Sequence, residues 1–591
     1  MDWQGWFTIA VVAAVLITLI SLPRLSSDLV LMAALLLLSL SGILTPEQAL
    51  AGFANPGLMT VAAMFVIAAG IRASGGVDLI VHRGLGRPTS QRRALVRLMV
   101  PVIAVSGFLN NTPVVATMIP AVSRWARLIR LPNSALMIPL SYASILGGTL
   151  TMIGTSTNLV VNGQYQALTG HAGFGLFALT PLGLVIAAAG LLFVVGCGPL
   201  LLPVRRSPEE TFADTRNFTF EVAVARDGPL TGRSIQQAGL RHLQRIYLAE
   251  IEREGRIITA VAPDEILRGG DRLVFVGDTD AIVDLLRING LVPAVGSQPA
   301  LERHVPERRL VEAVIAPHCE IVGTTIREGG FRDRYGAVVL AVARNGKHIR
   351  GRLSSIILAP GDVLLLEARP AVVGRLKRSR DFLLISELDH DLPDHSRAWL
   401  AWGILAAVMA LATTGLTSML NAALLGAALM LLTRCLQVGD ARRSLDLPVL
   451  ITIAASFALG KGLEASGAAA YLGSALIVVA GDNPWLLLGA TYVSVMVLTE
   501  LITNNAAALM MLPVVLAVTD RCGLNDAPYV MAVMVAASAS FSTPIGYQCN
   551  LMVSGPGGYR FTDFLRIGLP MNLMMAAVSI AAIPLLWPLS P

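Results

Sequence analysis

Long apolar stretches fill both ends of the chain, and a more polar stretch lies between them. Before the polar stretch, the apolar stretches are residues 6–22, 30–44, 58–71, 95–121, 135–161 and 174–202. After it, they are residues 399–412, 419–432, 447–462, 485–518, 529–553 and 567–586. A helix that spans a membrane needs about 20 mostly apolar residues. The pattern therefore predicts a polytopic α-helical membrane protein.

Polar residues and helix breakers interrupt two of these stretches. In residues 95–121 the interruption consists of Gly107, Asn110, Asn111, Thr112 and Pro113. Proline disfavours a helix interior, and non-helical backbone at membrane depth is tolerated only inside protein or beside a cavity. We therefore predict a re-entrant hairpin at about residues 94–128, with the asparagine pair at its tip. A second hairpin is predicted at about residues 485–518, with the polar residues Thr503, Asn504 and Asn505.

The two ends of the chain repeat the same landmarks in the same order. Pro56 precedes Ala73-Ser74-Gly75 as Pro448 precedes Ala465-Ser466-Gly467, and the offset between the copies is 392 residues (448 − 56). The same offset links residues 153–154 with 545–546 and Asn158 with Asn550, while the pair at 110–111 recurs at 504–505 with an offset of 394 (504 − 110). Repeated membrane halves with interrupted helices are typical of secondary transporters, and the interruptions indicate the binding site.

Arginines orient the predicted helices. They gather in residues 72–97, 124–130 and 205–206, and in the second half at 442–443 and 560–566. The positive-inside rule places these loops in the cytoplasm. If each hairpin is counted as non-spanning, each half makes five crossings. Because five is odd, equivalent helices run in opposite directions, and we expect an inverted repeat of two five-helix halves, each with a re-entrant hairpin.

The distribution of charge supports this division of the chain. Only 14% of the residues are charged, whereas soluble domains have about 25%, and most of the charges lie between residues 205 and 397. We therefore expect membrane half 1 at 1–204, a cytoplasmic α+β domain pair at 205–300 and 301–396, and membrane half 2 at 397–591. The net charge of +6 reflects this topology rather than nucleic-acid binding. The five cysteines show neither metal-ligand nor disulfide spacing.

Polar residues gather in four clusters within the apolar halves. Each cluster contains hydroxyl and amide side chains beside a break in the helix pattern. They are Asn110-Asn111-Thr112; Gly154-Thr155-Ser156-Thr157-Asn158; Thr503-Asn504-Asn505; and Ser542-Thr543-Pro544 with Gly546 and Asn550. Carbonyl, amide and hydroxyl oxygens suit Na⁺, while N–H groups at helix N-termini suit an anion. The alternative is that these residues merely join helices, but their repetition in register favours a substrate- and ion-binding site.

These clusters resemble a known family. Asn-Asn-Thr-Pro-Val-Val at 110–115, Gly-Gly-Thr-Leu-Thr-Met-Ile-Gly-Thr-Ser-Thr-Asn-Leu at 147–159 and Thr-Glu-Leu-Ile-Thr-Asn-Asn-Ala-Ala-Ala at 499–508 are similar to the divalent anion/sodium symporter family and its ion-transporter relatives. The resemblance implies a homodimeric elevator transporter whose hairpin tips and helix breaks hold Na⁺ and an anion. It implies one Na⁺ near Asn111, with Thr112 and residues 155–158. It implies another near Asn505, with Ser542, Thr543 and Asn550.

The chain departs from this family at both tips. Dicarboxylate-transporting members typically carry Ser-Asn-Thr at each tip, where this chain has Asn110-Asn111-Thr112 and Asn504-Asn505-Ala506. Because Ala506 has no hydroxyl, the departure bears on the second cation site and on dicarboxylate specificity.

Glu500 is an ionisable residue within the second predicted hairpin. An acid at this depth is a candidate functional residue by default. Its two possible roles are ion coupling and a structural hydrogen-bond anchor, and related families often carry such a glutamate in this hairpin. Lys461 and Glu464 are expected to form an i,i+3 pair on one helix face near a membrane end.

The polar middle of the chain is itself duplicated. Gly232 and Asp271 lie 39 residues apart (271 − 232), as do Gly323 and Asp362 (362 − 323). Alternating stretches such as 246–251 and 338–342 predict strands between these landmarks. The copies resemble the TrkA-C (RCK C-terminal) domain, which implies dimerisation and, in some channels and transporters, binding of a small regulatory ligand. The alternative is a scaffolding module, and the sequence has no dinucleotide-binding or Walker motif.

Three functions fit this sequence. The leading interpretation is Na⁺-coupled symport of a small anion across the inner (plasma) membrane. Sulfate is favoured because relatives that join this membrane fold to paired TrkA-C domains include sulfate carriers, and a dicarboxylate is second. Cation transport (Na⁺/H⁺ or K⁺) is an alternative, although no membrane segment carries paired aspartates or a K⁺-filter sequence. A transport-derived nutrient sensor is the third. The sequence shows no catalytic constellation, so we do not expect an enzyme, nor a cofactor beyond Na⁺ as the coupling ion.

Overall fold

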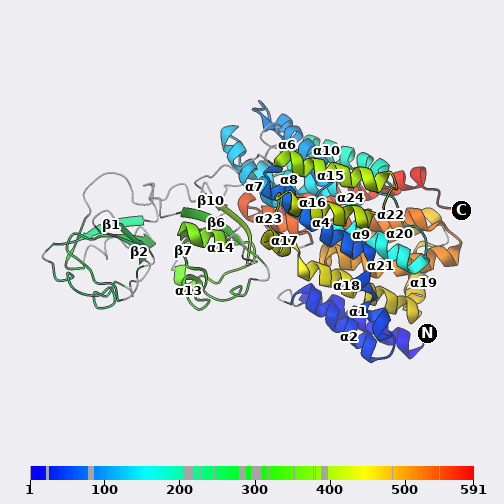
Figure 1. Cartoon of the computed structure of the whole chain (residues 1–591), viewed down its shortest axis with the longest axis horizontal. Helices are drawn as coiled ribbons and strands as arrows, with labels where there is room; N and C mark the ends of the chain where they lie inside the picture. Colours follow the sequence, from blue (N-terminus) through cyan, green and yellow to red (C-terminus); the bar gives the residue numbers. More distant parts are fainter. Residues whose placement is uncertain are drawn as a thin grey trace. The chain divides into compact units, whose positions relative to one another are not determined.

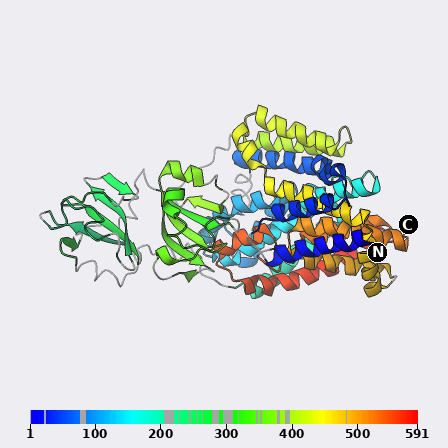
Figure 2. The same cartoon turned by 90° about the horizontal axis from the view of Figure 1, so that it is seen from below.

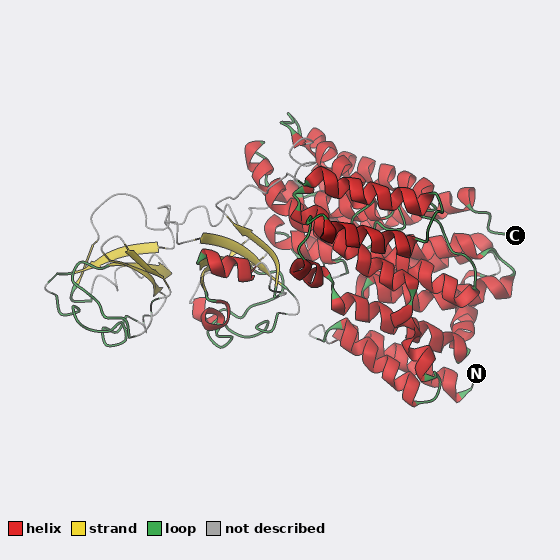
Figure 3. Cartoon of the chain, in the orientation of Figure 1, coloured by secondary structure: helices red, strands yellow, loops and turns green. Residues whose placement is uncertain are grey.

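The computed structural model contains two compact units. One comprises Met1–Val204, Leu392–Ser554 and Tyr559–Pro591, and the other comprises Arg205–Asp391 with Gly555–Gly558. The first unit is built of helices and the second mainly of strands and loops (Figure 3). The structure describes residues 2–21, 25–76, 85–203, 219–226, 228–240, 243, 246–253, 256–259, 261, 264–277, 288–293, 309–316, 319–344, 347–349, 353–376, 379, 381–387, 397–481, 483–544 and 546–590. Arg205, Arg206 and Ile545, which contributed to the sequence interpretation, lie outside these residues.

The helical unit contains two series of helices, which Figure 1 colours from blue to cyan and from yellow-green to red. The first series is α1 (Trp3–Ser21), α2 (Ser27–Leu40), α3 (Pro46–Leu50), α4 (Pro56–Ala73), α6 (Gln91–Ser106), α7 (Asn111–Leu128), α8 (Met137–Gly148), α9 (Ser156–Thr169) and α10 (Thr180–Leu201). The second is α15 (Ala398–Thr413), α16 (Met419–Leu432), α17 (Val438–Ser444), α18 (Leu447–Ala465), α19 (Ala468–Ala480), α20 (Pro484–Leu501), α21 (Asn504–Cys522), α22 (Asp526–Ser538), α23 (Gln548–Gly557) and α24 (Phe561–Leu586).

Many of these helices have the length and composition of membrane spans. In the described part of the chain, seven helical segments meet both criteria: Trp3–Ser21, Pro46–Ala73, Thr180–Leu201, Leu447–Ala465, Pro484–Leu501, Asn504–Cys522 and Phe561–Leu586. Shorter apolar helices accompany them, among them α2, α15, α16 and α22. The predicted polytopic helical membrane protein agrees with this architecture.

Helices from the two series pack against each other. Helix α2 packs on α18, and α16 packs on α4 (Figure 2). Small residues permit the close approach: a Cβ at Gly462 would lie 2.8 Å from Leu38, and one at Gly70 would lie 2.7 Å from the sulfur of Met430. Each series therefore completes its packing with helices of the other.

The predicted helix breaks are present. Residues 149–155 separate α8 from α9, and residues 539–547 separate α22 from α23. Short non-helical connections likewise separate α6 from α7 and α20 from α21. Helix α19 was not expected, because its 13 residues are fewer than the roughly 20 that a span requires. Lys461 and Glu464 form the expected pair, with the ammonium 2.9 Å from the carboxylate.

The second unit contains two sheets with the same strand order. The first has the order β3-β2-β4-β1-β5, and the second has β8-β7-β9-β6-β10 read in the matching direction. The first sheet is built from β1 (Thr219–Val224), β2 (Ile246–Arg253), β3 (Arg256–Thr259), β4 (Arg272–Gly277) and β5 (Leu291–Pro293). The second is built from β6 (Arg309–Ile315), β7 (Ala337–Arg344), β8 (Lys347–His348), β9 (Val363–Ala368) and β10 (Phe382–Glu387). All the strand pairs in both sheets are antiparallel.

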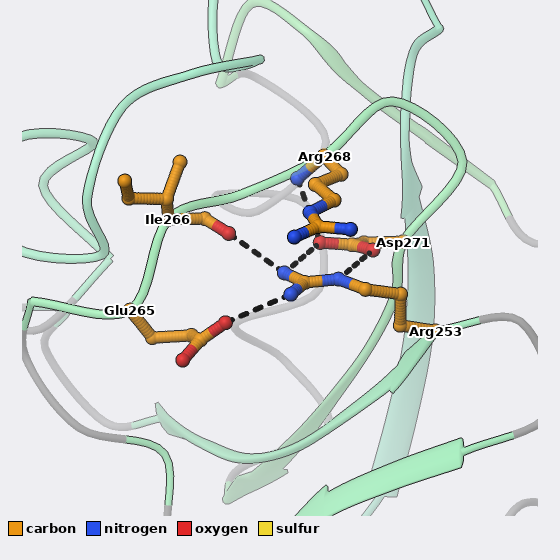
Figure 4. A network of polar contacts seen from close by, with 5 residues as sticks. All are labelled: Arg253, Glu265, Ile266, Arg268 and Asp271. Atoms are coloured by element: carbon orange, nitrogen blue, oxygen red, sulfur yellow. Dashed lines mark hydrogen bonds and ion pairs between the residues drawn. The ribbon is translucent and has the colours of Figure 1, made fainter.

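An arginine–aspartate pair, in which the aspartate is buried, joins the turn before the fourth strand of each copy. In the first copy Arg253 donates to both carboxylate oxygens of Asp271, at 2.9 and 2.8 Å, and to the carbonyl of Ile266 (Figure 4). In the second, Arg344 donates to Asp362 at 2.7 Å twice and to the carbonyl of Ile357. The hydrogen bonds that Arg253 donates to the Asp271 carboxylate raise the pKa of the Arg253 guanidinium above its ordinary value. The duplication seen in the sequence thus corresponds to a shared set of hydrogen bonds, to which the first copy adds one from Arg253 to Glu265 at 2.9 Å.

Candidate functional site

The predicted polar clusters lie where helices begin. Helices α7, α9, α21 and α23 start at Asn111, Ser156, Asn504 and Gln548. The preceding residues Asn110, Thr155 and Thr503 are of types that normally cap a helix, yet none of their side chains accepts a backbone N–H. Elsewhere in this unit Asn55, Ser90, Asn483 and Asn525 do make such caps. The N–H groups at these three helix starts therefore remain available to a ligand.

Asn158 and Asn550 stabilise the two helix breaks with equivalent hydrogen bonds. The Asn158 amide donates to the carbonyls of Gly148 and Thr151, at 3.2 and 3.1 Å. The Asn550 amide donates to the carbonyls of Ser540 and Thr543, at 2.9 and 3.0 Å. The asparagines are 1% and 0% exposed, so these bonds satisfy carbonyls that no longer have a helical partner.

Equivalent hydrogen bonds also occur at the tips of the two hairpin-like segments. They align the two tips differently from the alignment inferred from the sequence. Ser106 donates to Asn111 Oδ1 at 2.7 Å, and Thr499 donates to Asn504 Oδ1 at 2.9 Å. Both bonds span five residues. The equivalent of Asn111 is therefore Asn504, at an offset of 393 (504 − 111), and the pairing of Asn111 with Asn505 inferred from the sequence was wrong by one residue. Asn505 instead occupies the position of Thr112.

Hydrogen bonds between the halves bring these segments together. The Asn111 amide donates to the Tyr547 hydroxyl, which also interacts with Thr155. Thr112 donates to Gln548 Oε1 at 3.3 Å, and Thr157 donates to Asn505 Oδ1 at 3.0 Å. The structure thus gathers both tips and both breaks into one cluster that spans the two halves.

The cluster has a buried part and an accessible part. The buried predicted residues are Asn111, Gly154, Thr155, Thr157, Asn158, Ser542, Gly546 and Asn550. The partly exposed ones are Asn110, Thr112, Ser156, Asn504, Asn505, Thr543 and Pro544, and Thr503 is exposed. Most of the accessible residues lie in the first turn of α7, α9 or α21 or directly before it, where a bound ligand would contact them.

Glu500 gives the second half a polar network that has no counterpart among the described residues of the first half. Its carboxylate accepts from the Ser542 N–H at 2.9 Å, the Thr543 hydroxyl at 2.8 Å and the Asn572 amide at 2.8 Å. The corresponding position in the first half is Gly107, whose carbonyl accepts from Thr151. These bonds agree with the interpretation of Glu500 as a hydrogen-bond anchor.

Three residues of the site were not expected from the sequence. They are Tyr547, Gln548 and Asn572. The first two stand where the first half has Thr155 and Ser156, so no repeat marks them. Asn572 is a polar residue within the long, mostly apolar helix α24, where Thr562, Asp563, Arg566 and Ser579 are polar as well. A polar residue in an apolar helix was the one signal that could have found it.

Hydroxyl and amide groups supply most of the polar atoms of this site, beside the carboxylate of Glu500. In the described part of the chain, no group of three or more His, Cys, Asp or Glu residues could hold a metal ion. Hydroxyl and amide oxygens with broken-helix carbonyls can coordinate an alkali cation, and free helix N-termini can bind an anion. Interrupted helices arranged around such a site are those of a multi-pass secondary transporter.

The chain belongs to the citrate transporter family, whose sequence profile matches residues 13–513 and 446–589. It is 37% identical to a candidate sulfur deprivation response regulator of Chlamydomonas reinhardtii, over 94% of this chain and 97% of that protein. It is 32% identical to an uncharacterized transporter of Synechocystis sp., over 100% of this chain and 98% of that protein. Sodium/sulfate cotransporter 2 of C. reinhardtii is 27% identical, over 98% of this chain and 89% of its own length.

Proposed function

We propose that this chain is a Na⁺-coupled symporter of a small oxyanion, with sulfate as the favoured substrate and a dicarboxylate second. The observation that carries the proposal is the convergence of helix starts from both halves, with three of them uncapped. An uncapped N-terminus offers unpaired N–H groups and a partial positive charge to an anion. The similarity to a sodium/sulfate cotransporter over nearly the whole chain supports sulfate and Na⁺.

Sodium would bind on the oxygen-rich side of the same cluster. Asn111 Oδ1, with the hydroxyls of Thr112 and residues 155–157, offers ligands in the first half. Asn504 Oδ1, with Ser542 and Thr543, offers them in the second. Because no cationic side chain belongs to the cluster, a bound Na⁺ would neutralise part of the anion's charge. Anion and cation binding would then favour each other, which is what symport requires.

We further propose an inverted repeat that moves its site by an elevator mechanism in a homodimer within the inner membrane. The strand-rich unit, 205–396, would lie in the cytoplasm as two TrkA-C-like domains with a regulatory or scaffolding role. Its two equal sheets and arginine-rich flanks support this assignment. A cysteine introduced at Arg327 should react with an impermeant maleimide after permeabilisation and not in intact cells. Labelling from outside would contradict the topology.

Uptake of labelled sulfate, succinate and citrate into proteoliposomes, with and without an inward Na⁺ gradient, tests the function. We expect Na⁺-dependent accumulation of sulfate above the other two. Faster uptake of succinate or citrate would reassign the substrate. A nutrient sensor is the second candidate, because of the 37% identity to a candidate sulfur deprivation response regulator. It predicts sulfate binding without accumulation.

A further inference from the structure

Two side-chain amides in the candidate site are held by threonine hydroxyls of the other half. Thr112 donates to Gln548 Oε1, and Thr157 donates to Asn505 Oδ1. The threonine lies at a tip in the first pair and at a break in the second. In both pairs the amide oxygen accepts the threonine proton, and the NH₂ group lies at the opposite edge of the planar amide.

The nitrogen atoms of these two amides remain available. Within the described residues, neither Gln548 Nε2 nor Asn505 Nδ2 donates a hydrogen bond. Gln548 is exposed and Asn505 is partly exposed. Asn111, Asn158 and Asn550 differ, because they are buried and their amide nitrogens are all committed. Asn504 is oriented within its own segment by Thr499, whereas the two pairs are oriented across the halves.

Both free amides lie in the first turn of a helix. Gln548 is the first residue of α23, and Asn505 is the second residue of α21. Each can therefore present two N–H donors beside the positive end of a helix. A cation could bind only the amide oxygen, whereas the NH₂ groups, which are the atoms without a partner, can donate to an oxygen of an anion. The arrangement favours an oxygen of an anion over a cation.

We propose that Gln548 and Asn505 form an amide pair that donates to the oxygens of the transported oxyanion and sets its specificity. Thr112 and Thr157 are positioning residues that orient the pair. The inference rests on the proposed function, and it moves Asn505 from the sodium site to the anion site. Gln548 has Ser156 as its counterpart, so the pair makes the two faces of the anion site unequal.

The test replaces each NH₂ by an oxygen with almost no change of shape, through Gln548→Glu and Asn505→Asp. In proteoliposomes we measure the KM for sulfate at saturating Na⁺ and the half-saturating Na⁺ concentration at saturating sulfate, with succinate and citrate as further arms. Hydrogen bonds to charged groups are strong, so each variant should raise the anion KM by about 10- to 150-fold. The Na⁺ value should stay constant. Gln437→Glu, an exposed residue outside the site, controls for the added charge.

The positioning role predicts a smaller effect of the threonines. Thr112→Val should raise the anion KM by a few-fold, and Thr112→Ser should restore it, because serine keeps the hydroxyl. The proposal is overturned if Asn505→Asp leaves the anion KM unchanged and lowers the half-saturating Na⁺ concentration, since the oxygen would then be a Na⁺ ligand. An unchanged anion KM in Gln548→Glu overturns it as well.

A failure of the proposed function would look different. If the wild-type protein accumulates no anion, sulfate binding to the purified full-length protein by calorimetry replaces the uptake measurement. Loss of that binding in Gln548→Glu would support the amide pair without transport. Equal binding by both proteins, or none by the wild type, would refute it.

Discussion

Asn158 and Asn550 lie 392 residues apart in the sequence (550 − 158), yet each amide donates to the carbonyls ten and seven residues before it. The four bonds lie between 2.9 and 3.2 Å. The same local geometry has therefore been kept in both halves, whereas most of the side chains around it differ. Each asparagine stabilises a helix break with two hydrogen bonds. These bonds fix the position of the helix start beside the candidate ligand site.

Replacing Asn158 or Asn550 should lower the folded yield. Asn158→Ala leaves the Gly148 and Thr151 carbonyls without their donor, and a buried unsatisfied group costs about 1–3 kcal/mol. Asn158→Asp should be worse, because it turns a carboxylate toward two carbonyls. The monodisperse fraction in detergent and the melting temperature measure the effect. Equal behaviour of the Asp and Ala variants would contradict this account.

Asn111→Ala should raise the Na⁺ requirement for uptake. Loss of a ligand with no freely available replacement corresponds to about 1–3 kcal/mol, or about 5- to 150-fold in affinity. Asn504→Ala should do the same, since the hydrogen bonds make Asn504 the equivalent residue. Arg327→Ala, an exposed residue of the second unit, is the control. A lower folded yield with an unchanged Na⁺ dependence would identify Asn111 as a helix-joining residue.

Glu500→Gln should retain folded yield and Na⁺ dependence. Glutamine keeps an oxygen for the Ser542 N–H and the Asn572 amide, and its NH₂ can donate to the Thr543 hydroxyl. Glu500→Ala removes all three acceptor contacts and should destabilise the break by about 1–3 kcal/mol for each donor left unpaired. The comparison of melting temperature with uptake separates the two roles. Loss of Na⁺-driven accumulation in a well-folded Glu500→Gln protein would establish a coupling role instead.

Asp271→Ala should loosen the first sheet and leave the second unchanged, and Asp362→Ala should do the reverse. The side chains of these aspartates are 1% and 0% exposed. The arginine partners are 15% and 40% exposed, so the cost should stay below the roughly 3–5 kcal/mol of a fully buried pair. Hydrogen–deuterium exchange in the full-length protein should show faster exchange in β4 or β9, respectively. Exchange that rises equally in both sheets would show that the copies do not unfold separately.

The sequence predicted the features that depend on residue type at a repeated position. The helix breaks were found because Asn158 and Asn550, with their neighbouring glycines, recur at one offset. The duplicated turns of the second unit were found because Gly232 and Gly323 both have a left-handed φ, of 83° and 80°, which glycine adopts most readily. In these cases the local backbone geometry demands the residue, so the sequence carries the signal.

Other features depend on contacts between residues that are far apart in the sequence, and no repeated residue type indicates them. The asparagine pairs 110–111 and 504–505 were aligned because their residues are identical. The hydrogen bonds from Ser106 and Thr499 show instead that Asn111 is equivalent to Asn504. Tyr547 and Gln548 became part of the site because they reach Asn111 and Thr112 across 436 residues. The sequence therefore identified the polar clusters but not the partners that join them.

The packing of α2 on α18, and of α16 on α4, has a consequence for the order of synthesis. Helix α2 ends at Leu40 and α18 begins at Leu447, so 407 residues (447 − 40) must follow before its partner emerges. At about 5–20 residues per second, this interval is roughly 20–80 seconds. During that time the face of α2 that carries Leu31, Ala34, Leu35 and Leu38 lacks the helix α18 against which it packs. Lipid or a membrane chaperone must cover it, and premature termination would leave it exposed to association with other nascent helices.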